Sequence, residues 1–318
     1  MRRRRFLQGT LAGLGTIAAI GVTRRAEASF HVAVGDVGTD DFAPDGDSFL
    51  RLPTLHTIGR RNPDGGLDWE AGGLGDQPGQ LNYPKGMMDD PLGERLYVTD
   101  TGNHHVDVYS TGGRFLFQFG ARGSGAGQFL FPNDVVVDRA GIVYVADTGN
   151  HRVQVFDANG GYLRQFGGFG QGGDRLNGPS ALALHPDGTL HVADKGNNRI
   201  QVFSLHGVYH GRYGGSGDAL GQFRQLQAVA ADSHGRVYAA DRASWLVTMF
   251  GPQGQPFLRF QPRFADGTAA VPMGLAITDD DTLFVAAVRG PAGYRAVREF
   301  ETALYIPTAA QAGRSSKE

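Results

Sequence analysis

The sequence predicts an all-β fold built from repeated four-stranded sheets, and three observations support this. Four segments align without gaps, and their aspartates Asp100, Asp147, Asp194 and Asp241 follow one another at intervals of 47 residues. Short runs within each segment alternate apolar and polar residues with period two, as half-buried strands do. After the N-terminal segment, no stretch carries a sustained apolar period of 3.6 residues, so helices are not expected.

Each aligned segment is expected to form four short strands joined by tight turns. In the second copy the expected strands are Asp134–Asp138, Ile142–Asp147, Arg152–Asp157 and Tyr162–Gly167. Glycine and asparagine lie between them, where hairpins often need a positive φ. Such a sheet cannot bury both faces alone, so the copies must stack. Stacking around an axis predicts a β-propeller with one blade of four antiparallel strands per copy.

The copies also resemble a known repeat. The second one reads Gly-x-Gly-x-Gly-Gln-Phe, then Val-Tyr-Val-Ala-Asp-Thr-Gly-Asn-His-Arg-Val-Gln-Val-Phe-Asp, which is similar to the NHL repeat. The resemblance covers about residues 75–305 and implies a propeller of six blades. The triplets that correspond to the Asn-His-Leu signature are Asn103-His104-His105, Asn150-His151-Arg152 and Asn197-Asn198-Arg199.

Five copies are visible, the last one decayed as LFVAAVRGPAGYRAVREF, so a sixth blade needs another source. Residues 29–59 are long enough to complete the ring, and Ser48–Gly59 is similar to the outermost strand of a repeat. We expect pairing of the chain ends to close the ring and remove a free sheet edge. Five blades closed by the same strand are the alternative. Residues 60–74 are expected to form a loop, and residues 309–318 a disordered tail after a propeller domain of residues 29–308.

The first 28 residues read as a cleaved export signal. Arg3-Arg4-Arg5-Phe6-Leu7-Gln8 resembles the twin-arginine motif, with Gln8 in place of the usual lysine. The apolar run Leu11–Val22 is too short for a membrane-spanning helix, which needs about 20 residues. Ala26-Glu27-Ala28 suits signal peptidase. We therefore expect a periplasmic or secreted protein without a stable membrane anchor.

Charge and cysteine content exclude several function classes. Cleavage after Ala28 would leave 24 Lys and Arg against 31 Asp and Glu, a net charge of about −7. Nucleic acids are bound mainly through clustered cations, so a nucleic-acid partner is not expected. The chain has no cysteine, which excludes disulfides, thiolate metal sites and thiol nucleophiles.

The resemblance places the candidate binding site at the mouth of the central channel. In this family the innermost strand of each blade starts just after the proline of the repeat and lines the channel. These positions vary while the framework repeats, which suits ligand choice, although they could equally fill the channel with side chains and water. Asp134 adjoins the mouth, and Arg242 and Trp245, which replace the Asn-His turn of the fourth copy, are further ligand-binding candidates. The expected mouth residues are Lys85, Asn133, Ser180, Gln227 and Met273.

Two propeller enzymes are similar in part but lack support here. The peptidyl-hydroxyglycine amidating lyase holds zinc with histidines that follow the prolines, whereas none of the five mouth positions is histidine. Calcium-dependent lactonases place an asparagine where Asn133-Asp134 stands, yet Lys85 would oppose a cation. No catalytic residue and no metal or other cofactor is therefore predicted, and calcium at the mouth stays an alternative.

Other recurring polar residues are interpreted as structural. His104 and His151 are expected to bond backbone groups of their turn rather than to bind a metal. The repeated aspartates are expected to accept hydrogen bonds from the turn that follows. The sequence thus favours a monomeric scaffold that binds a peptide, glycan or protein ligand. A lyase or lactonase-like hydrolase acting at the channel mouth is the alternative.

Overall fold

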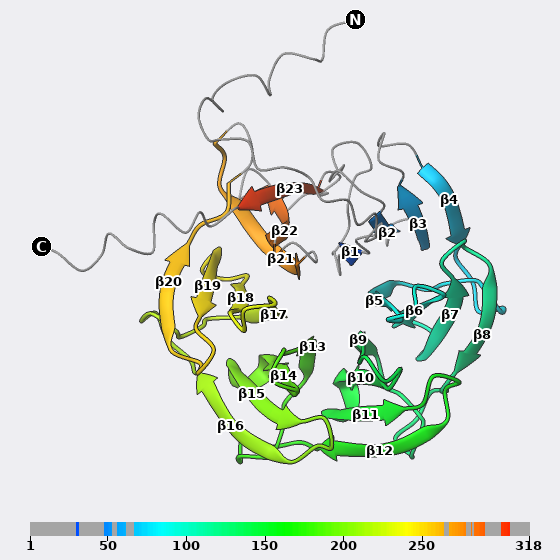
Figure 1. The fold of residues 1–318 in the computed structure, drawn as a ribbon, viewed down its shortest axis with the longest axis horizontal. Helices are drawn as coiled ribbons and strands as arrows, with labels where there is room; N and C mark the ends of the chain where they lie inside the picture. Colours follow the sequence, from blue (N-terminus) through cyan, green and yellow to red (C-terminus); the bar gives the residue numbers. More distant parts are fainter. Residues whose placement is uncertain are drawn as a thin grey trace, which may run out of the picture.

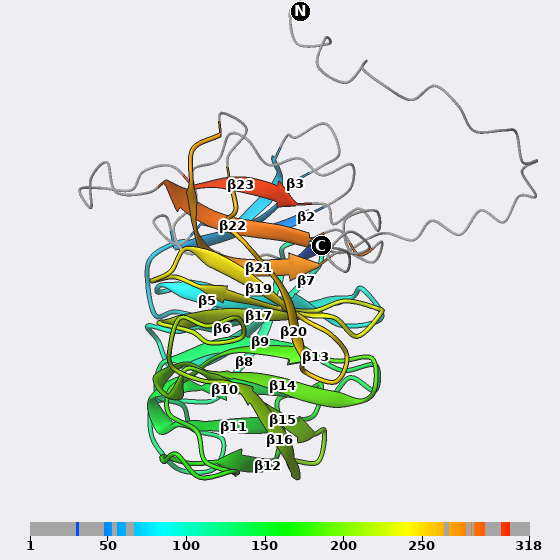
Figure 2. The same ribbon diagram turned by 90° about the vertical axis from the view of Figure 1, so that its left-hand side faces the viewer.

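The structure, a computed structural model, describes residues 30–31, 48–52, 56–61, 67–263, 267–277, 281, 283–289 and 300–305. These residues are almost entirely β and form six sheets arranged as blades around a central axis (Figure 1). Figure 2 shows the same ring from its side, with successive sheets following one another through the molecule. No helix in the described part has the length and apolar character needed to cross a membrane. The predicted β-propeller is confirmed.

We number the blades I to VI in chain order. Blade I contains β1 (Phe30–His31), β2 (Ser48–Leu52), β3 (Thr57–Arg61) and β4 (Leu67–Gly72). Blade II contains β5 (Pro84–Asp89), β6 (Arg95–Asp100), β7 (His105–Ser110) and β8 (Phe115–Phe119). Blade III contains β9 (Pro132–Val137), β10 (Val143–Asp147), β11 (Arg152–Phe156) and β12 (Tyr162–Gly167).

The remaining blades follow the same order. Blade IV contains β13 (Pro179–Leu184), β14 (Thr189–Asp194), β15 (Arg199–Ser204) and β16 (Tyr209–Gly214). Blade V contains β17 (Leu226–Ala231), β18 (Val237–Asp241), β19 (Leu246–Phe250) and β20 (Pro256–Phe260). Blade VI contains β21 (Ala270–Ile277), β22 (Leu283–Arg289) and β23 (Phe300–Tyr305). Two 3-10 turns are η1 (Thr148–Asn150) and η2 (Lys195–Asn197).

The two faces of each blade pack against different neighbours, which is why the repeats need a ring. In β11, Val153 and Val155 join a core cluster with Leu182 and Val192 of blade IV. Phe156 points the other way, into a cluster shared with blade II. Alternate residues of one strand therefore bury against opposite neighbours, as the period-two pattern predicted. The strand bounds of blade III lie within two residues of the sequence expectation.

Blade I corrects the sequence interpretation in two ways. The segment expected to be a loop, residues 60–74, contains the outermost strand β4. The segment expected to be an outermost strand, Ser48–Gly59, instead contains β2 and the start of β3, the two middle strands of the sheet. Residues 67–72, which form β4, precede the part of the chain that resembles the repeat, so similarity alone could not assign them. In addition, β1 pairs with β2 in parallel, unlike the antiparallel pairs of the other blades.

The expected closure by paired chain ends is wrong for the described strands. Each of the six sheets is formed by one continuous portion of the chain. Blade I instead lies beside blade VI, with β1 in contact with both β21 and β5. Packing of neighbouring blades, rather than a shared sheet, therefore brings the two ends of the described ring together. The predicted signal at residues 1–28 and the predicted tail at 309–318 lie outside the described residues.

Candidate functional site

A proline begins the inner strand in three of the blades, and the residue after this proline lies at the channel. Pro84, Pro132 and Pro179 begin β5, β9 and β13. Each of these strands is the edge of its blade nearest the axis (Figure 1). Proline has no N–H to donate, so it is tolerated at the first residue of an edge strand. The residue after it lies at the mouth of the central channel.

Seven of the eight ligand-binding candidates predicted from the sequence line one cavity of about 230 Å³. Trp245 does not line this cavity. It takes a left-handed φ of 64° in the turn before β19, the place that His104 and His151 hold in blades II and III. The other seven residues predicted from the sequence come from five blades and do line the cavity: Lys85, Asn133, Asp134, Ser180, Gln227, Arg242 and Met273. Their part in ligand binding stays a prediction.

Hydrogen bonds link neighbouring blades around the mouth. Lys85 Nζ donates to Asn133 Oδ1 at 2.7 Å, and Asn133 Nδ2 donates to the backbone oxygen of Ser180 at 2.5 Å. Ser180 Oγ donates to the backbone oxygen of Gln227 at 3.0 Å. The Gln227 side chain in turn accepts from Lys195 Nζ at 3.0 Å. The polar groups of four successive blades are therefore held in place before any ligand arrives.

Lys195 is a mouth residue that the sequence analysis missed. It follows the repeated aspartate of its blade, as Thr101 and Thr148 do in the two preceding copies. Those threonine hydroxyls donate to the carbonyl of the proline that begins the next blade, at 2.6 and 2.7 Å. Lys195 and Arg242 replace them in the third and fourth copies and line the mouth. A change from threonine to a cation at one repeat position was the signal available in the sequence.

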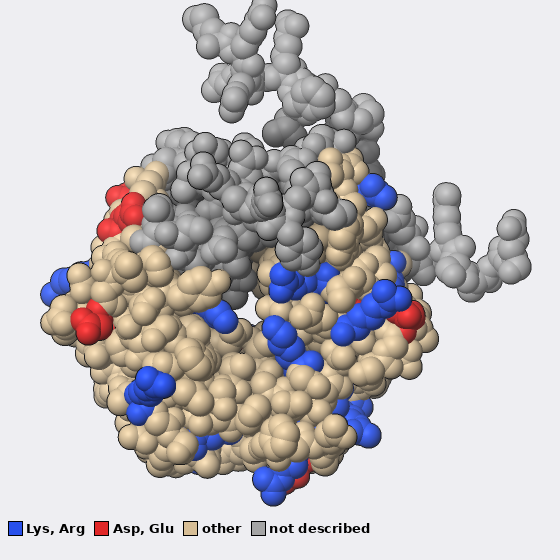
Figure 3. Space-filling model, turned by 180° about the vertical axis from the view of Figure 1, so that it is seen from behind, with Lys and Arg blue, Asp and Glu red and all other residues tan. Residues whose placement is uncertain are grey.

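The mouth is electropositive. Lys85, Lys195 and Arg242 line it together, and burial, followed by the nearby charge of Arg242, lowers the pKa of Lys195. Lys85 Nζ also lies 5.8 Å from the centroid of the Tyr83 ring, which lines the cavity too. Asp134 is the one carboxylate among the described lining residues, and its oxygens accept from two backbone N–H groups at 2.8 and 2.9 Å. Figure 3 shows Lys and Arg side chains gathered beside the central hollow of one face.

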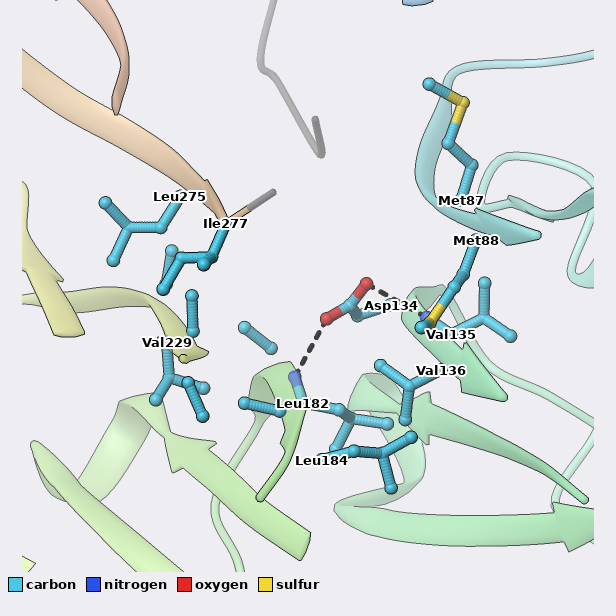
Figure 4. A pocket seen from close by; sticks show the side chains of 15 residues that line it. Met87, Met88, Asp134, Val135, Val136, Leu182, Leu184, Val229, Leu275 and Ile277 are labelled. Atoms are coloured by element: carbon cyan, nitrogen blue, oxygen red, sulfur yellow. Dashed lines mark hydrogen bonds between the residues drawn. The ribbon is translucent and has the colours of Figure 1, made fainter. Parts of the chain in front are cut away.

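Below the polar mouth, the channel becomes apolar. A second cavity of about 180 Å³ is lined by the inner strands of blades II to VI (Figure 4). Met88, Leu182 and Val229 contribute to its wall, and Asp134 lies at its border with the mouth. The channel thus offers charged groups at one end and an apolar wall beyond them.

The opposite face differs in charge. A cavity of about 790 Å³ there is lined by several carboxylates. Two of them hold hairpin turns, because Asp138 accepts from the N–H groups of Ala140 and Ile142, and Asp232 accepts from those of His234 and Arg236. These acids therefore serve the turns between the first two strands of a blade. The lining carboxylates are Asp89, Asp90, Asp138, Asp232 and Asp281.

The recurring histidines connect blades. His104 and His151 adopt φ of 63° and 58°, and their Nδ1 atoms accept from backbone N–H groups at the entry to the next blade, both at 2.9 Å. Asn198, with φ of 50°, does the same through its Oδ1 at 3.2 Å. The expected bonding to backbone is confirmed, but the partner lies in the neighbouring blade rather than in the same turn.

The repeated aspartates have the predicted structural role, with a different partner. Asp100, Asp147 and Asp194 accept from N–H groups in the loop that precedes the inner strand of their own blade, at 2.8, 2.8 and 2.6 Å. Among the four, Asp241 also accepts from the turn that follows it, at 3.0 and 3.3 Å. Asp241 accepts from the entry-loop N–H groups of Arg224 and Gln225 as well, at 2.7 and 2.9 Å, so each carboxylate ties the entry loop of its blade to the second strand.

Comparison with known sequences identifies the repeat. The NHL repeat family matches residues 129–156 and 176–203, in blades III and IV. Protein brain tumor of Drosophila melanogaster is 38% identical over 68 residues, which are 21% of this chain and 6% of that protein. RING finger protein nhl-1 of Caenorhabditis elegans is 38% identical over 87 residues, 24% of this chain and 9% of that protein. The match spans less than a tenth of either curated relative.

Solved structures share the propeller fold. A streptogramin B lyase has a TM-score of 0.58 at 13% identity. The match covers 83% of this chain and 92% of the lyase chain. A catalytically inactive virginiamycin B lyase from Staphylococcus aureus, with quinupristin, has a TM-score of 0.57 at 11% identity. The match covers 90% of this chain and 98% of the lyase chain. A chain of a nidogen–laminin complex has a TM-score of 0.51 at 20% identity. The match covers 72% of this chain and 81% of that chain. At these identities the likeness concerns the fold alone.

Proposed function

We propose that this NHL-repeat β-propeller is an exported binding protein whose channel mouth holds an anionic group of a peptide, glycan or protein ligand. The observation that carries the proposal is the convergence of Lys85, Lys195 and Arg242 on one cavity. Cations held in a partly desolvated mouth favour a carboxylate or phosphate, because charge-assisted hydrogen bonds are stronger than neutral ones. Lysine and arginine together can offer point and forked donors to such a group.

The dimensions of the mouth favour recognition of one chemical group rather than a whole ligand. Cavities that enclose a drug-sized ligand usually measure about 300–1,000 Å³, and this one measures about 230 Å³. A terminal or side-chain carboxylate would fit, with the rest of the ligand lying across the surrounding face. The fixed hydrogen bonds between blades support this reading, since a preorganised site loses less entropy on binding.

The comparisons bear on the choice between binding and catalysis. One propeller of similar fold occurs in a nidogen–laminin complex, where proteins associate. The lyase with quinupristin carries a histidine-to-alanine substitution that makes it catalytically inactive. The described residues that line the mouth here offer no imidazole, and their ordered donors suit an anion. Binding is therefore favoured, and a lyase or hydrolase acting at the mouth remains the alternative.

The repeat itself supplies the variants for a test. Lys195→Thr and Arg242→Thr install the residue that the first two copies use at this position, so both should fold. Arg122→Thr, an exposed arginine in the loop between β8 and β9, is the matched control. The probes for calorimetric titration are citrate and an acidic hexapeptide, prepared with a free or an amidated C-terminus.

We expect citrate and the free peptide to bind and the amidated peptide to bind more weakly. Each mouth variant should lower the affinity about tenfold, the effect of losing one charge-assisted bond, and Arg122→Thr should not. Absence of binding by both anionic probes, or equal affinity of all variants, would contradict the proposal. If NMR shows that the protein converts the peptide into a product, the alternative of a lyase or hydrolase acting at the mouth is favoured instead.

Export is tested separately, because the signal and the mouth are independent features. Replacement of Arg3 and Arg4 by lysine should retain the protein in the cytoplasm of an expressing bacterium if the twin-arginine route is used. The matched control replaces Arg24 and Arg25 by lysine. Unchanged fractionation of the first variant, with export still taking place, would point to another route.

A further inference from the structure

The repeats provide an internal reference for a buried polar cluster. In blade III the carboxylate of Asp147 pairs with Arg152 Nε at 2.8 Å, and in blade IV that of Asp194 pairs with Arg199 Nε at 2.7 Å. The aspartates are 0% exposed in both blades, and the arginines are buried. One buried acid is thus matched by one buried base in each of these two copies.

A glutamine completes the cluster in blade III. Gln154 Nε2 donates to the Asp147 carboxylate at 3.0 Å and to the Gln128 carbonyl at 2.6 Å, and its Oε1 accepts from Gly127 N–H at 2.9 Å. Arg152 Nη2 donates to the same Gln128 carbonyl at 2.8 Å. The trio of aspartate, arginine and glutamine is formally neutral and well supplied with hydrogen-bond partners.

Blade II keeps the aspartate and changes the other two residues. His105 stands where blades III and IV have arginine, and Asp107 stands where they have glutamine. All three residues are buried, with Asp100 and Asp107 at 0% exposure. The formal charge of the trio falls from zero to −2 with a neutral imidazole, and an isolated buried charge is costly. The trio of blade II therefore contains no permanent cation to balance its two acids.

Within the described part of the chain, two of the three side chains in this cluster have polar atoms without hydrogen-bond partners, whereas the third, Asp100, accepts from Asn82 N–H at 2.8 Å and from Asn103 Nδ2 at 2.7 Å. Among the described residues, His105 Nε2 and both carboxylate oxygens of Asp107 are buried without a hydrogen bond. His105 Nε2 lies 3.3 Å from Asp100 Oδ2 and 3.4 Å from Asp107 Oδ2. These separations exceed those of charge-assisted hydrogen bonds, which are about 2.7–2.9 Å. All three residues bring a ligand atom within 4.8 Å of the others.

We propose that Asp100, His105 and Asp107 form a structural site for a divalent transition metal, best suited to zinc. Ligands about 2.0–2.2 Å from zinc at tetrahedral angles lie about 3.3–3.5 Å from one another. The two separations measured from His105 Nε2 fall in that range. One imidazole with two carboxylates suits zinc, whereas calcium and magnesium prefer oxygen ligands alone.

The surroundings support a cation at this point. His105 Nε2 lies near both Asp100 Oδ2 and Asp107 Oδ2, so two buried carboxylates face the point that a metal ion would occupy. The loop carbonyls contacted by the arginine of blade III, those of Gly125 and Gln128, have their sequence counterparts at Gln77 and Gln80, and we expect one of these two to supply the fourth ligand. A metal here would tie the β6–β7 turn to the loop that enters blade II.

The test uses zinc chloride as the probe on the purified chain after chelator treatment. We expect one zinc ion per chain by calorimetric titration, a higher thermal midpoint with zinc, and a lower one after chelation. The decisive variant is His105→Arg with Asp107→Gln, which installs the trio of blades III and IV. This double variant should fold, bind no zinc at this stoichiometry, and show no response to chelator.

Two further variants assign the bound zinc to this cluster. Asp107→Asn preserves shape but removes one ligand, so it keeps the test informative if the double variant does not fold, and it should weaken zinc binding. Asp281→Asn disrupts the partly exposed Asp232–His234–Asp281 group and should leave the titration unchanged. A chain that neither binds zinc nor changes its midpoint, or a double variant that still binds zinc at this stoichiometry, would overturn the proposal.

Discussion

The Asp147 carboxylate is a hub whose removal should have a large effect on stability. It is 0% exposed and accepts from Leu130 N–H at 2.8 Å, in the loop that enters blade III. It also accepts from Arg152 Nε at 2.8 Å, Asn150 Nδ2 at 2.9 Å and Gln154 Nε2 at 3.0 Å. One side chain therefore joins the entry loop, the turn after β10 and the third strand.

The size of the stability loss depends on which interaction of Asp147 contributes most. A neutral buried hydrogen bond contributes about 1 kcal/mol net, whereas removing one partner of a buried ion pair costs about 3–5 kcal/mol because the other charge is left unpaired. Asp147→Ala leaves the Arg152 guanidinium buried without its carboxylate partner, although it keeps three oxygen partners, the Gly125 and Gln128 carbonyls and Gln165 Oε1, at 2.7, 2.8 and 2.7 Å. We expect the free energy of unfolding to fall by about 3–5 kcal/mol.

Urea unfolding followed by circular dichroism measures this loss. Combining Asp147→Ala with Arg152→Met removes the stranded charge, so the double variant should be more stable than Asp147→Ala alone. Asp157→Ala, which loses only the turn contacts of that side chain, should cost about 1 kcal/mol. A loss below about 1 kcal/mol for Asp147→Ala, or a double variant no more stable than the single one, would refute the reasoning.

Three other predictions concern the channel, acid stability and the blade contacts. Gly86→Ala would place a Cβ 2.5 Å from the Asp134 Cα, so the inner strands of blades II and III must shift, lowering stability by about 1–3 kcal/mol and weakening binding at the mouth. Burial lowers the pKa of His191 to about 4. Below pH 6.5 the unfolded chain gains this proton before the folded chain does, so stability should fall by up to about 3 kcal/mol as the pH drops to 4. His151→Asn should be almost neutral, because Asn198 makes the equivalent contact, whereas His151→Ala should cost about 1–2 kcal/mol.

Each of these has a result that contradicts it. If Gly86→Ala leaves the thermal midpoint and the probe affinity unchanged, the inner strands of blades II and III can shift without losing stability. A His191→Gln variant should lose part of the acid sensitivity seen by urea midpoints at about pH 7 and about pH 4.5, and equal sensitivity would exclude that imidazole. Equal midpoints for the alanine and asparagine variants at position 151 would show that its side-chain contact contributes nothing measurable.

The candidate site was largely predictable where the repeat places residues. The interval between Asp100, Asp147 and Asp194 and the prolines before Lys85 and Asn133 place equivalent residues at equivalent points of successive blades. The equivalence of these positions follows from the repeat interval, and the resemblance to the NHL repeat implied their place at the channel mouth. The residues that line the mouth could therefore be named before their distances were known, although what they bind stays a prediction.

The features that the sequence did not predict depend on contacts between blades. Lys195 reaches the mouth because it meets Gln227, 32 residues later, and the histidine contacts join residues 27 positions apart. Blade I lacks the repeat's motif, so only its pairing shows that β4 is the outer strand.

The amino-acid sequence by itself determined the all-β repeat and the propeller, because strand period and turn residues act locally, and its resemblance to the NHL repeat implied most mouth residues. The tertiary structure alone decided which charges meet, how the ring closes, and that His105 and Asp107 are buried together beside Asp100. Burial and charge pairing arise only when neighbouring blades pack and exclude water, which no single repeat specifies.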